Sequence, residues 1–232
     1  MRKGVQRLYR EVAPTYEAVN HVLTFGLDIR WRKKAARELS GKAGEFWLDV
    51  CCGTGEMTQN LSLQAESTTR ILSVDFSPEM ISLARKKDYA KPILFILTDV
   101  GSLPFADATF DCLVISFSTR NINLNRREIL RHLREFFRVL KPGGCFLNLE
   151  TSQPSSPLLK KCFHFYIKTI VPALGSLISG ARSGYRYLAY TVPRFYSSED
   201  FTALLNQVGF REVRCRKFLF GLAAIHLAAK QH

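Results

Sequence analysis

Short apolar runs alternate with amphipathic stretches from residue 46 to about residue 150 of the chain. The apolar runs predict five strands, at 46–51, 71–76, 93–99, 111–118 and 145–150. Between them, helical spacing of apolar residues predicts helices at 57–63, 77–87 and 125–140. The segment "KPGG" is expected to end the last of these helices. Apolar strands that alternate with helices indicate a parallel sheet covered on both faces.

The pattern changes on either side of this region. Residues 1–40 are predicted to form a helical cap with a break at Gly26. The alternation also stops between 151 and 196, which we interpret as a helical lid inserted before the last strands. The remaining pattern predicts one helix and two strands, at 198–208, 211–218 and 222–230. We therefore expect a single α/β domain over 1–232, with a Rossmann-like, mostly parallel seven-stranded sheet.

The longest apolar segment begins at Cys162 and lies within the predicted lid. His164, Lys168 and Pro172 interrupt it, together with two glycines, which disfavours a membrane-spanning helix. The N-terminal residues carry charges with no apolar core behind them, so no secretory signal is predicted. The six cysteines form no C-x-x-C pair, which favours reduced thiols over disulfides or zinc ligands. Together these features predict a cytoplasmic protein.

The chain is strongly basic, with 33 Lys and Arg against 20 Asp and Glu and a net charge of +13. The cations cluster at 30–37, 126–138 and 211–217. A basic surface suits nucleic acid or anionic lipid headgroups, and solvated helix faces explain the clusters equally well. Charge alone therefore does not identify a partner.

Candidate chemistry begins where the first predicted strand ends in Cys51-Cys52-Gly53-Thr54-Gly55. A glycine-rich turn at a strand end lets a ligand approach the backbone closely. Asp75 ends the second strand, 22 positions after Gly53, where a carboxylate can accept hydrogen bonds from both hydroxyls of a ribose. This spacing predicts a cofactor that contains adenosine.

Two such cofactors compete. A dinucleotide favours a third glycine, but Thr58 stands at that position, and Glu56 stands where the pyrophosphate would bind. S-adenosyl-L-methionine instead carries a sulfonium and an ammonium group, which Glu56 and Asp49 would attract. Asp99 ends the third strand and either accepts from the adenine amino group or caps the next turn. The pattern therefore favours S-adenosylmethionine and a class I methyltransferase fold.

Several longer stretches carry a resemblance to a known family. They include "YEAVNHVLTFGLDIRWRK", "LDVCCGTGEMT", "SLPFADATFD", "ISFSTRNI", "LETSQP" and "GLAAIHLAAK", and together they extend over nearly the whole chain. By them the chain resembles the menaquinone and ubiquinone biosynthesis C-methyltransferases, closest to the demethylmenaquinone methyltransferases, and "LETSQP" favours the menaquinone branch. The resemblance implies C-methylation of a prenylated hydroquinone, demethylmenaquinol to menaquinol, with a ubiquinone-pathway benzoquinol as the alternative.

The resemblance also implies a set of cofactor contacts. Beside the turn glycines Gly53 and Gly55, these are Thr54, Asp75, Asp99, Val100 and Ser116. The sequence departs from the family at Ser118-Thr119, where the family usually has Gly-Leu. That departure affects the loop just before the next candidate residues.

Arg120 and Asn121 follow the fourth strand, at the edge where substrate would meet cofactor. Arginine stays protonated, so we assign Arg120 to stabilising a phenolate and Asn121 to orienting a ring hydroxyl; loop-anchoring hydrogen bonds are the structural alternative. Tyr16, Tyr185 and His226 are weaker candidates for the quinol side. The reaction needs no metal, and no clustered His/Asp/Glu set is evident.

Two rival functions share some of these features. An RNA methyltransferase would share the fold and charge, but the chain lacks an Asn/Asp-Pro-Pro-Tyr motif and a Pro-Cys nucleophile motif. A non-catalytic cofactor-binding subunit is opposed by the intact turn and by Asp75. The expected partners are a prenylated quinol and an anionic membrane rather than nucleic acid, while a homo-oligomer stays open.

Overall fold

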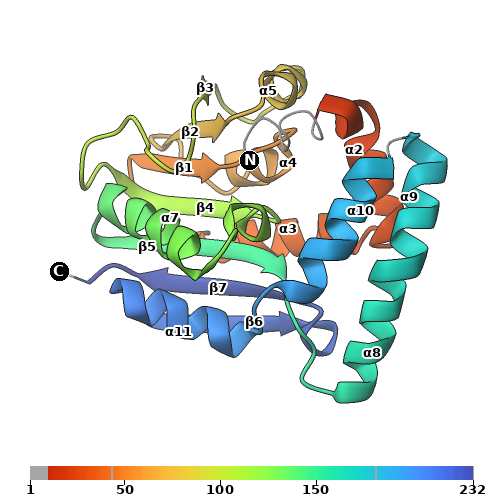
Figure 1. Cartoon of the computed structure of the whole chain (residues 1–232). Helices are drawn as coiled ribbons and strands as arrows, with labels where there is room; N and C mark the ends of the chain where they lie inside the picture. Colours follow the sequence, from red (N-terminus) through yellow and green to blue (C-terminus); the bar gives the residue numbers. More distant parts are fainter. Residues whose placement is uncertain (1–9, 43, 181, 232) are drawn as a thin grey trace.

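The computed structural model describes residues 10–42, 44–180 and 182–231, except the side chain of residue 182. Its centre is a seven-stranded sheet in the order β3-β2-β1-β4-β5-β7-β6 (Figure 1). The strands are β1 Phe46–Val50, β2 Arg70–Asp75, β3 Ile93–Leu97, β4 Phe110–Ser116, β5 Leu140–Thr151, β6 Arg211–Phe218 and β7 Ala223–Ala229. The first five strands are parallel, and β7 is antiparallel to β5 and β6. The predicted mostly parallel α/β sheet is confirmed.

Helices cover both faces of this sheet. The longer helices are α2 Tyr16–Leu23, α3 Leu27–Arg37, α4 Glu56–Ser62, α5 Pro78–Ala84, α7 Arg126–Val139, α8 Pro157–Phe165, α9 Val171–Ser179, α10 Arg182–Thr191 and α11 Ser198–Val208. A short helix, α6 Thr119–Ile122, follows β4. Helices α7 and α11 lie on the front face in Figure 1, and α3 and α4 lie behind the sheet. The predicted break at Gly26 is confirmed, because its φ of +70° separates α2 from α3.

The sheet is buried on both sides because alternate side chains of each strand enter two different cores. In β4, Leu113 and Ile115 join the core beneath α7 and α11. Their neighbours Cys112 and Val114 join the core beneath α3 and α4. This alternation follows from the two-residue period of a strand. With both faces covered, the carboxyl-end edge of the parallel strands is the place where a ligand is expected.

The helix ends just before "KPGG", as expected, but the strand that follows begins earlier than predicted. Helix α7 ends at Val139, and β5 already begins at Leu140, so residues 141–144 belong to the strand. Gly143 has a φ of +77°, and the β4–β5 register shifts between Phe110 and Cys112. The glycines therefore shape an irregular strand start rather than a helix end.

The lid contains one continuous helix over Pro157–Ser179, which we call the lid helix. Helix α8, the π-helical segment Tyr166–Ile170 and α9 follow one another without a break. Pro172 is accommodated because the Val171 N–H bonds to the Tyr166 carbonyl five residues back, a wider turn that absorbs the proline ring. Among the described residues, Pro157–Ser179 is the single helix that is long and apolar enough to cross a membrane by length and composition alone. The expected interruptions therefore do not break the helix.

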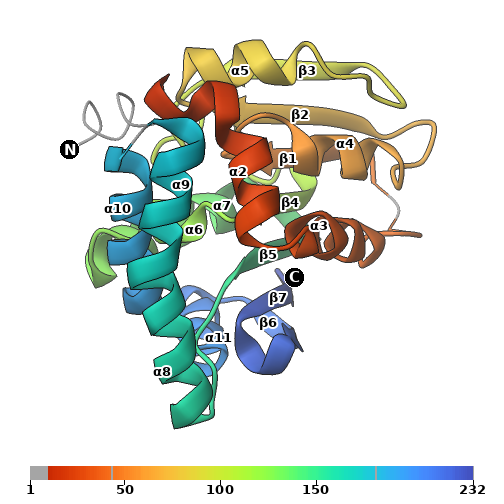
Figure 2. The same cartoon turned by 90° about the vertical axis from the view of Figure 1, so that its right-hand side faces the viewer.

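The cap and the lid pack on each other beside the sheet. Figure 2 shows α2, α9 and α10 side by side at the edge to which the parallel strands point. Val19 and Leu23 of α2 share a small core with Ile167, Val171 and other lid residues. This cap–lid core joins segments about 150 positions apart in the sequence and closes the ligand-binding edge of the sheet.

The close approach of Gly175 to Tyr185 in the cap–lid core predicts the sign of a stability change. A Cβ on Gly175 would lie 2.4 Å from the Tyr185 ring. Gly175→Ala should therefore destabilise the protein by about 1–3 kcal/mol in urea unfolding, because overpacking outweighs the gain in helix propensity. In a Tyr185→Ala background the same change should instead stabilise. The same sign in both backgrounds would contradict this packing.

Candidate active site

A glycine turn and one carboxylate join the ends of β1 and β2. The Gly53 N–H donates to Asp75 Oδ2 at 2.9 Å, and the Ser77 N–H donates to Oδ1 at 2.9 Å. Gly55 has a φ of +84°, and a Cβ there would lie 2.3 Å from the Tyr89 hydroxyl. A side chain is thus excluded at Gly55, while the space above Gly53 is open toward the pocket.

Asp49 lies buried under this turn. Thr58 Oγ1 donates to Asp49 Oδ2 at 2.6 Å, and Oδ1 has no hydrogen-bond partner among the described residues. Burial raises the pKa of Asp49 to about 7, the Thr58 hydrogen bond opposes this, and the charge of Asp75 adds to it. A buried carboxylate with one free oxygen in a pocket wall is a ready partner for a cationic group.

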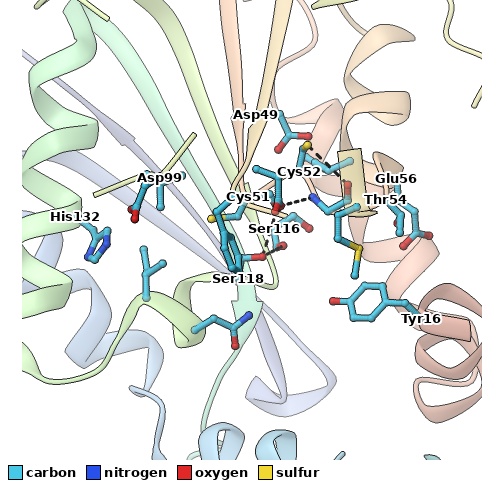
Figure 3. Close-up of a pocket in the computed structure, with 18 of the residues that line it drawn as sticks. Tyr16, Asp49, Cys51, Cys52, Thr54, Glu56, Asp99, Ser116, Ser118 and His132 are labelled. Atoms are coloured by element: carbon cyan, nitrogen blue, oxygen red, sulfur yellow. Dashed lines mark hydrogen bonds between the residues drawn. The ribbon is translucent and has the colours of Figure 1, made fainter. Parts of the chain in front are cut away.

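The rest of the pocket is built from neighbouring strand ends. Asp99, Ser116 and His132 line it with Thr54 and Val100, and Figure 3 shows Asp99 and His132 opposite Tyr16 and Glu56. Ser116 Oγ is buried without a hydrogen-bond partner among the described residues. Asp99 Oδ1 accepts from the Gly101 N–H at 2.8 Å, so this residue both caps its turn and lines the pocket.

These residues fit S-adenosylmethionine. The free Oδ1 of Asp49 suits a cation, and the unpartnered Ser116 Oγ offers a donor or acceptor. The open space above Gly53 admits a ligand against the backbone. All seven cofactor residues expected from the sequence lie at this edge, and five of them line the pocket beside Gly53: Thr54, Asp75, Asp99, Val100 and Ser116. Gly55 instead shapes the turn.

The cap contributes a buried cation to the pocket. Arg32 Nη1 lies 2.6 Å from Asp28 Oδ2, and its Nη2 lies 3.2 Å from Glu56 Oε2. His21 Nδ1 contacts Asp28 Oδ2 at 2.9 Å, and Nε2 lies 3.3 Å from Glu56 Oε1. Burial alone would raise the pKa of Asp28, but hydrogen bonds from Thr24 and Arg32 and the Arg32 charge hold it below its usual value.

The expectation that no His/Asp/Glu set would cluster is wrong. Donor atoms of Glu17, His21 and Glu56 all lie within 4.8 Å of one another. Each of these side chains already has a partner elsewhere: Glu17 pairs with Lys87, His21 hydrogen-bonds with Asp28, and Glu56 pairs with Arg32. We therefore assign the group to the ion-pair network that ties the cap to α4.

A second, larger cavity lies between the cap and the lid. It has a volume of about 390 Å³, and its walls are mainly apolar, with Trp31, Phe163 and Ile167 among them. Tyr16 and Arg32 line both this cavity and the cofactor pocket. A group bound in the cavity would therefore meet the cofactor at these two side chains.

Arg120 and Asn121 both lie at the junction, which is the place where the apolar cavity meets the cofactor pocket, but on different sides of it. Arg120 lines the apolar cavity and Asn121 lines the cofactor pocket. Arg120 is buried, and its Nη1 donates to Glu150 Oε1 at 2.6 Å and to the Phe117 carbonyl at 2.7 Å. Loop-anchoring contacts are therefore present, beside a position that suits contact with substrate.

The departure at Ser118-Thr119 leaves this loop intact. The left-handed residue is Phe117, with a φ of +53°, whereas Ser118 has a φ of −124°. Thr119 Oγ1 donates to Asn148 Oδ1 in the core. No glycine is needed at 118, because the unusual backbone angle falls one residue earlier.

The three weaker candidates for the quinol side lie in different parts of the structure. Tyr16 lies at the junction, where burial raises the pKa of its hydroxyl against the lowering charges of Arg120 and Arg32. Tyr185 is buried in the cap–lid core and lines neither large cavity. His226 lies in β7 under α11, with Nε2 3.0 Å from the Ser198 carbonyl, and lines neither cavity. It is a core histidine rather than a proton acceptor for substrate.

Sequence reasoning missed two residues of the site. Arg32 belongs to the basic cluster at 30–37, which we interpreted only as surface charge, yet it is buried. His132 lies within the predicted helix 125–140 and lines the cofactor pocket. For Arg32 a signal existed, since Asp28 precedes it by one helical turn and can pair with it.

Comparison with known proteins agrees with this geometry. A model of the ubiE/COQ5 methyltransferase family matches residues 1–230. Demethylmenaquinone methyltransferase from Staphylococcus saprophyticus is 35% identical over 230 residues, covering 99% of this chain and 97% of the relative. The Lactobacillus johnsonii protein of the same name is 36% identical over 233 residues, covering 99% and 93%.

Solved structures share the fold. A methyltransferase from Thermotoga maritima, described as a possible histamine N-methyltransferase, has a TM-score of 0.69 at 18% identity, covering 97% of this chain and 99% of that chain. Human N-acetylserotonin methyltransferase in complex with S-adenosylmethionine has a TM-score of 0.63 at 18% identity, covering 94% and 58%. The fold and family define an S-adenosylmethionine-dependent methyltransferase, as predicted. The chain belongs to the ubiE/COQ5 methyltransferase family.

The raised pKa of Asp49 predicts pH-dependent cofactor binding. Asp49 carries a proton below about pH 7 and must release it to face a cation. Affinity for S-adenosylmethionine should therefore fall up to about tenfold per pH unit below 7, and calorimetry of Asp49→Asn should show weaker binding without this slope. Glu66→Gln, an exposed control, should keep the slope. A wild-type affinity independent of pH from 6 to about 7.5 would remove Asp49 from the site.

The free energy of unfolding of the ligand-free protein should depend on pH in the opposite sense to the cofactor affinity. The folded pKa of Asp49, about 7, lies above its ordinary value of 3.8, so the ligand-free protein loses stability as pH rises between these values. Asp49→Asn lacks this loss and should melt at a higher temperature than wild type at pH values above 7. A lower melting temperature for the variant there would contradict the assigned burial.

Proposed function

We propose that this protein transfers a methyl group to a ring carbon of a prenylated hydroquinone, with demethylmenaquinol as the preferred substrate. The observation that carries the proposal is the apolar cavity that meets the cofactor pocket at Tyr16 and Arg32. An apolar cavity with a few polar groups at one end suits a molecule with a greasy tail and a hydroxylated ring. The demethylmenaquinone methyltransferases that resemble this chain over 99% of its length support the naphthoquinol over a benzoquinol.

The chemistry requires an activated carbon and a dry site. When bound, S-adenosylmethionine supplies the electrophilic methyl group. A quinol that loses a hydroxyl proton delocalises charge onto the ortho carbon, which makes that carbon nucleophilic. The protein residues therefore have to hold the ring, stabilise the phenolate and exclude water. No metal is needed for these tasks.

Three polar side chains at the junction of the two cavities are suited to holding the ring and stabilising the phenolate. The Arg120 guanidinium lines the cavity and would stabilise the phenolate, while Asn121 on the cofactor side would orient the ring hydroxyl. Tyr16 lines both cavities and would contact the same oxygen. Arg32, held by Asp28 and Glu56, keeps a second positive charge at the junction.

We further propose that residues 1–232 act as one methyltransferase domain, with cap and lid enclosing the substrate. A prenylated substrate resides in a membrane, and the net charge of +13 suits peripheral contact with the anionic inner face of that membrane. The protein would accordingly be cytoplasmic and bind the membrane only at its surface.

The substrate assignment is tested by direct comparison of acceptors. Purified protein with S-adenosylmethionine should methylate a short-chain demethylmenaquinol analogue faster than the matching benzoquinol, as measured by product mass and rate under reducing conditions. Transfer RNA should accept no methyl group. Preference for the benzoquinol would move the assignment to the ubiquinone pathway, whereas cofactor binding without any methyl transfer would favour a non-catalytic subunit.

Arg120 requires a test that separates charge stabilisation from loop anchoring. Arg120→Gln alone leaves Glu150, which is 1% exposed, as an uncompensated buried carboxylate, and should cost about 3–5 kcal/mol of stability. The informative variant is Arg120→Gln with Glu150→Gln, compared with Glu150→Gln alone. Single-turnover methyl transfer should be slower in the double variant by about 10²–10³, with cofactor affinity nearly unchanged.

The pH response provides the control. Raising the pH should partly restore transfer in the double variant, because more quinol ionises without help. Arg120→Lys should recover only part of the rate, since a point charge does not reproduce the planar guanidinium. Equal rates for Glu150→Gln and the double variant would leave Arg120 with an anchoring role only.

A further inference from the structure

The apolar cavity is open at the end away from the cofactor pocket. Phe25, in the turn between α2 and α3, and Leu219, in the turn between β6 and β7, both line the cavity. Both are also exposed, Phe25 at 82% and Leu219 at 44%. These two turns therefore form a mouth through which the far end of a long ligand reaches the outside of the protein.

Large apolar side chains surround this mouth and continue along the lid helix. We call this set the lid face: Val22, Phe25, Ile29, Leu158, Phe165, Leu174, Leu177, Ile178, Leu219 and Phe220, all exposed. The Phe25 ring lies 6.5 Å from Tyr166 of the lid helix, which joins the cap and lid parts of the set. Leu177 is 82% exposed and Phe220 is 84% exposed. An apolar surface of this kind marks a binding site rather than ordinary surface.

The charge along the lid segment has one sign. From Thr151 to Ser198 the sequence contains six Lys and Arg and no Asp or Glu. Lys160, Lys161 and Lys168 are exposed on the lid helix itself. The cap adds exposed cations next to Phe25 and Ile29, at Arg30 and Lys33. Exposed apolar groups flanked by lysines and arginines characterise a helix that lies in a membrane interface.

The inner side of the lid helix excludes a spanning arrangement. Ile167 and Val171 are buried in the cap–lid core, and Gly175 is packed against the Tyr185 ring. A helix surrounded by lipid would lose these contacts. The exposed side is therefore available to lipid while the inner side stays on the protein, which leaves the helix lying along the surface.

We propose that the lid face docks on an anionic lipid bilayer, with Leu177, Phe165 and Phe220 inserted among the lipid chains and the cavity mouth held at the apolar layer. The proposal rests on the proposed function in one respect, that the cavity takes a prenylated substrate, whose tail then passes directly between bilayer and cavity. A second copy of the chain is a poorer partner, because a two-fold contact would place the lysines of one lid helix against those of the other, and residues 151–198 contain no acid that could pair with them.

Vesicle binding of two matched variants tests the surface. Phe165→Ser with Leu177→Ser removes apolar groups that line neither cavity. Leu94→Ser with Leu97→Ser is the control, since these leucines are similarly exposed on β3, an edge strand of the sheet that lies away from the lid helix (Figure 1). Wild type and control should cosediment with phosphatidylcholine vesicles that contain phosphatidylglycerol, and the lid variant should bind at least about tenfold more weakly.

Two further experiments test the role of the lid lysines and the insertion of residue 177 into the bilayer. Lys160→Glu with Lys161→Glu and Lys168→Glu should abolish the preference for phosphatidylglycerol. A Leu177→Trp variant should show a blue-shifted emission with vesicles, and Leu94→Trp should not. Equal vesicle binding of the lid variant and wild type, or a wild-type dimer that the lid variant dissolves, would overturn the proposal.

Failure of the docking surface and failure of the proposed function remain distinguishable. Methyl transfer to a short-chain quinol in solution needs no membrane, so the lid variant should keep the wild-type rate in that assay. With a long-chain quinol in vesicles, the lid variant should be slower by about the factor by which its vesicle binding falls. A lid variant that loses vesicle binding yet keeps the full rate on the long-chain quinol would overturn the role of the lid face in substrate delivery.

Discussion

The ion pair of Arg32 with Asp28 and Glu56 holds the cap over the cofactor site. All three side chains are buried, so each charge depends on its partners for compensation. Glu56 begins α4 directly after the glycine turn, whereas Arg32 and Asp28 lie on α3. The pairing therefore joins the cap to the helix that follows the cofactor turn. Without it, the wall shared by the two cavities would lose its fixed position.

The cofactor pocket concentrates negative charge at a cost in stability. Asp49, Asp75 and Glu56 are buried near one another, and burial raises the pKa of each. The fold partly compensates: Asp75 accepts two backbone N–H groups and Glu56 faces Arg32. Asp49 is compensated least, because one of its oxygens has no hydrogen-bond partner in the described part of the chain. A cationic cofactor would supply the missing compensation, which would explain why a destabilising carboxylate is present there.

The lid uses the two sides of one helix for different purposes. Its inner side packs on the cap and supplies apolar walls to the cavity, through residues such as Phe163 and Ile167. Its outer side exposes apolar groups and lysines. The π-helical segment lets Pro172 fit without a break in the helix, so both sides stay continuous over the 23 residues of Pro157–Ser179. A broken helix would separate the cavity wall from the outer face.

The sequence by itself determined the sheet and the cofactor edge. Strands of period two alternating with helices specify a parallel sheet, and parallel strands bring their carboxyl ends to one edge. Asp49, Asp75 and Asp99 could therefore be placed together from their positions at three strand ends. The start of β5 was placed wrongly, because a left-handed glycine suits an irregular strand start as well as a helix end.

Only the tertiary structure decided which side chains complete the site. Arg32 is buried by contacts with α4 and lies over the Phe117 ring, and the cavity that it lines has further walls from the lid, more than 120 residues later in the chain. The grouping of Glu17 and His21 with Glu56 depends on the same docking. His226 had the right chemistry for a proton acceptor, yet its strand carries it under α11. The spacing of residues along the chain reveals only local periodicity. These contacts arise because distant segments pack on each other, and no local sequence pattern predicts that packing.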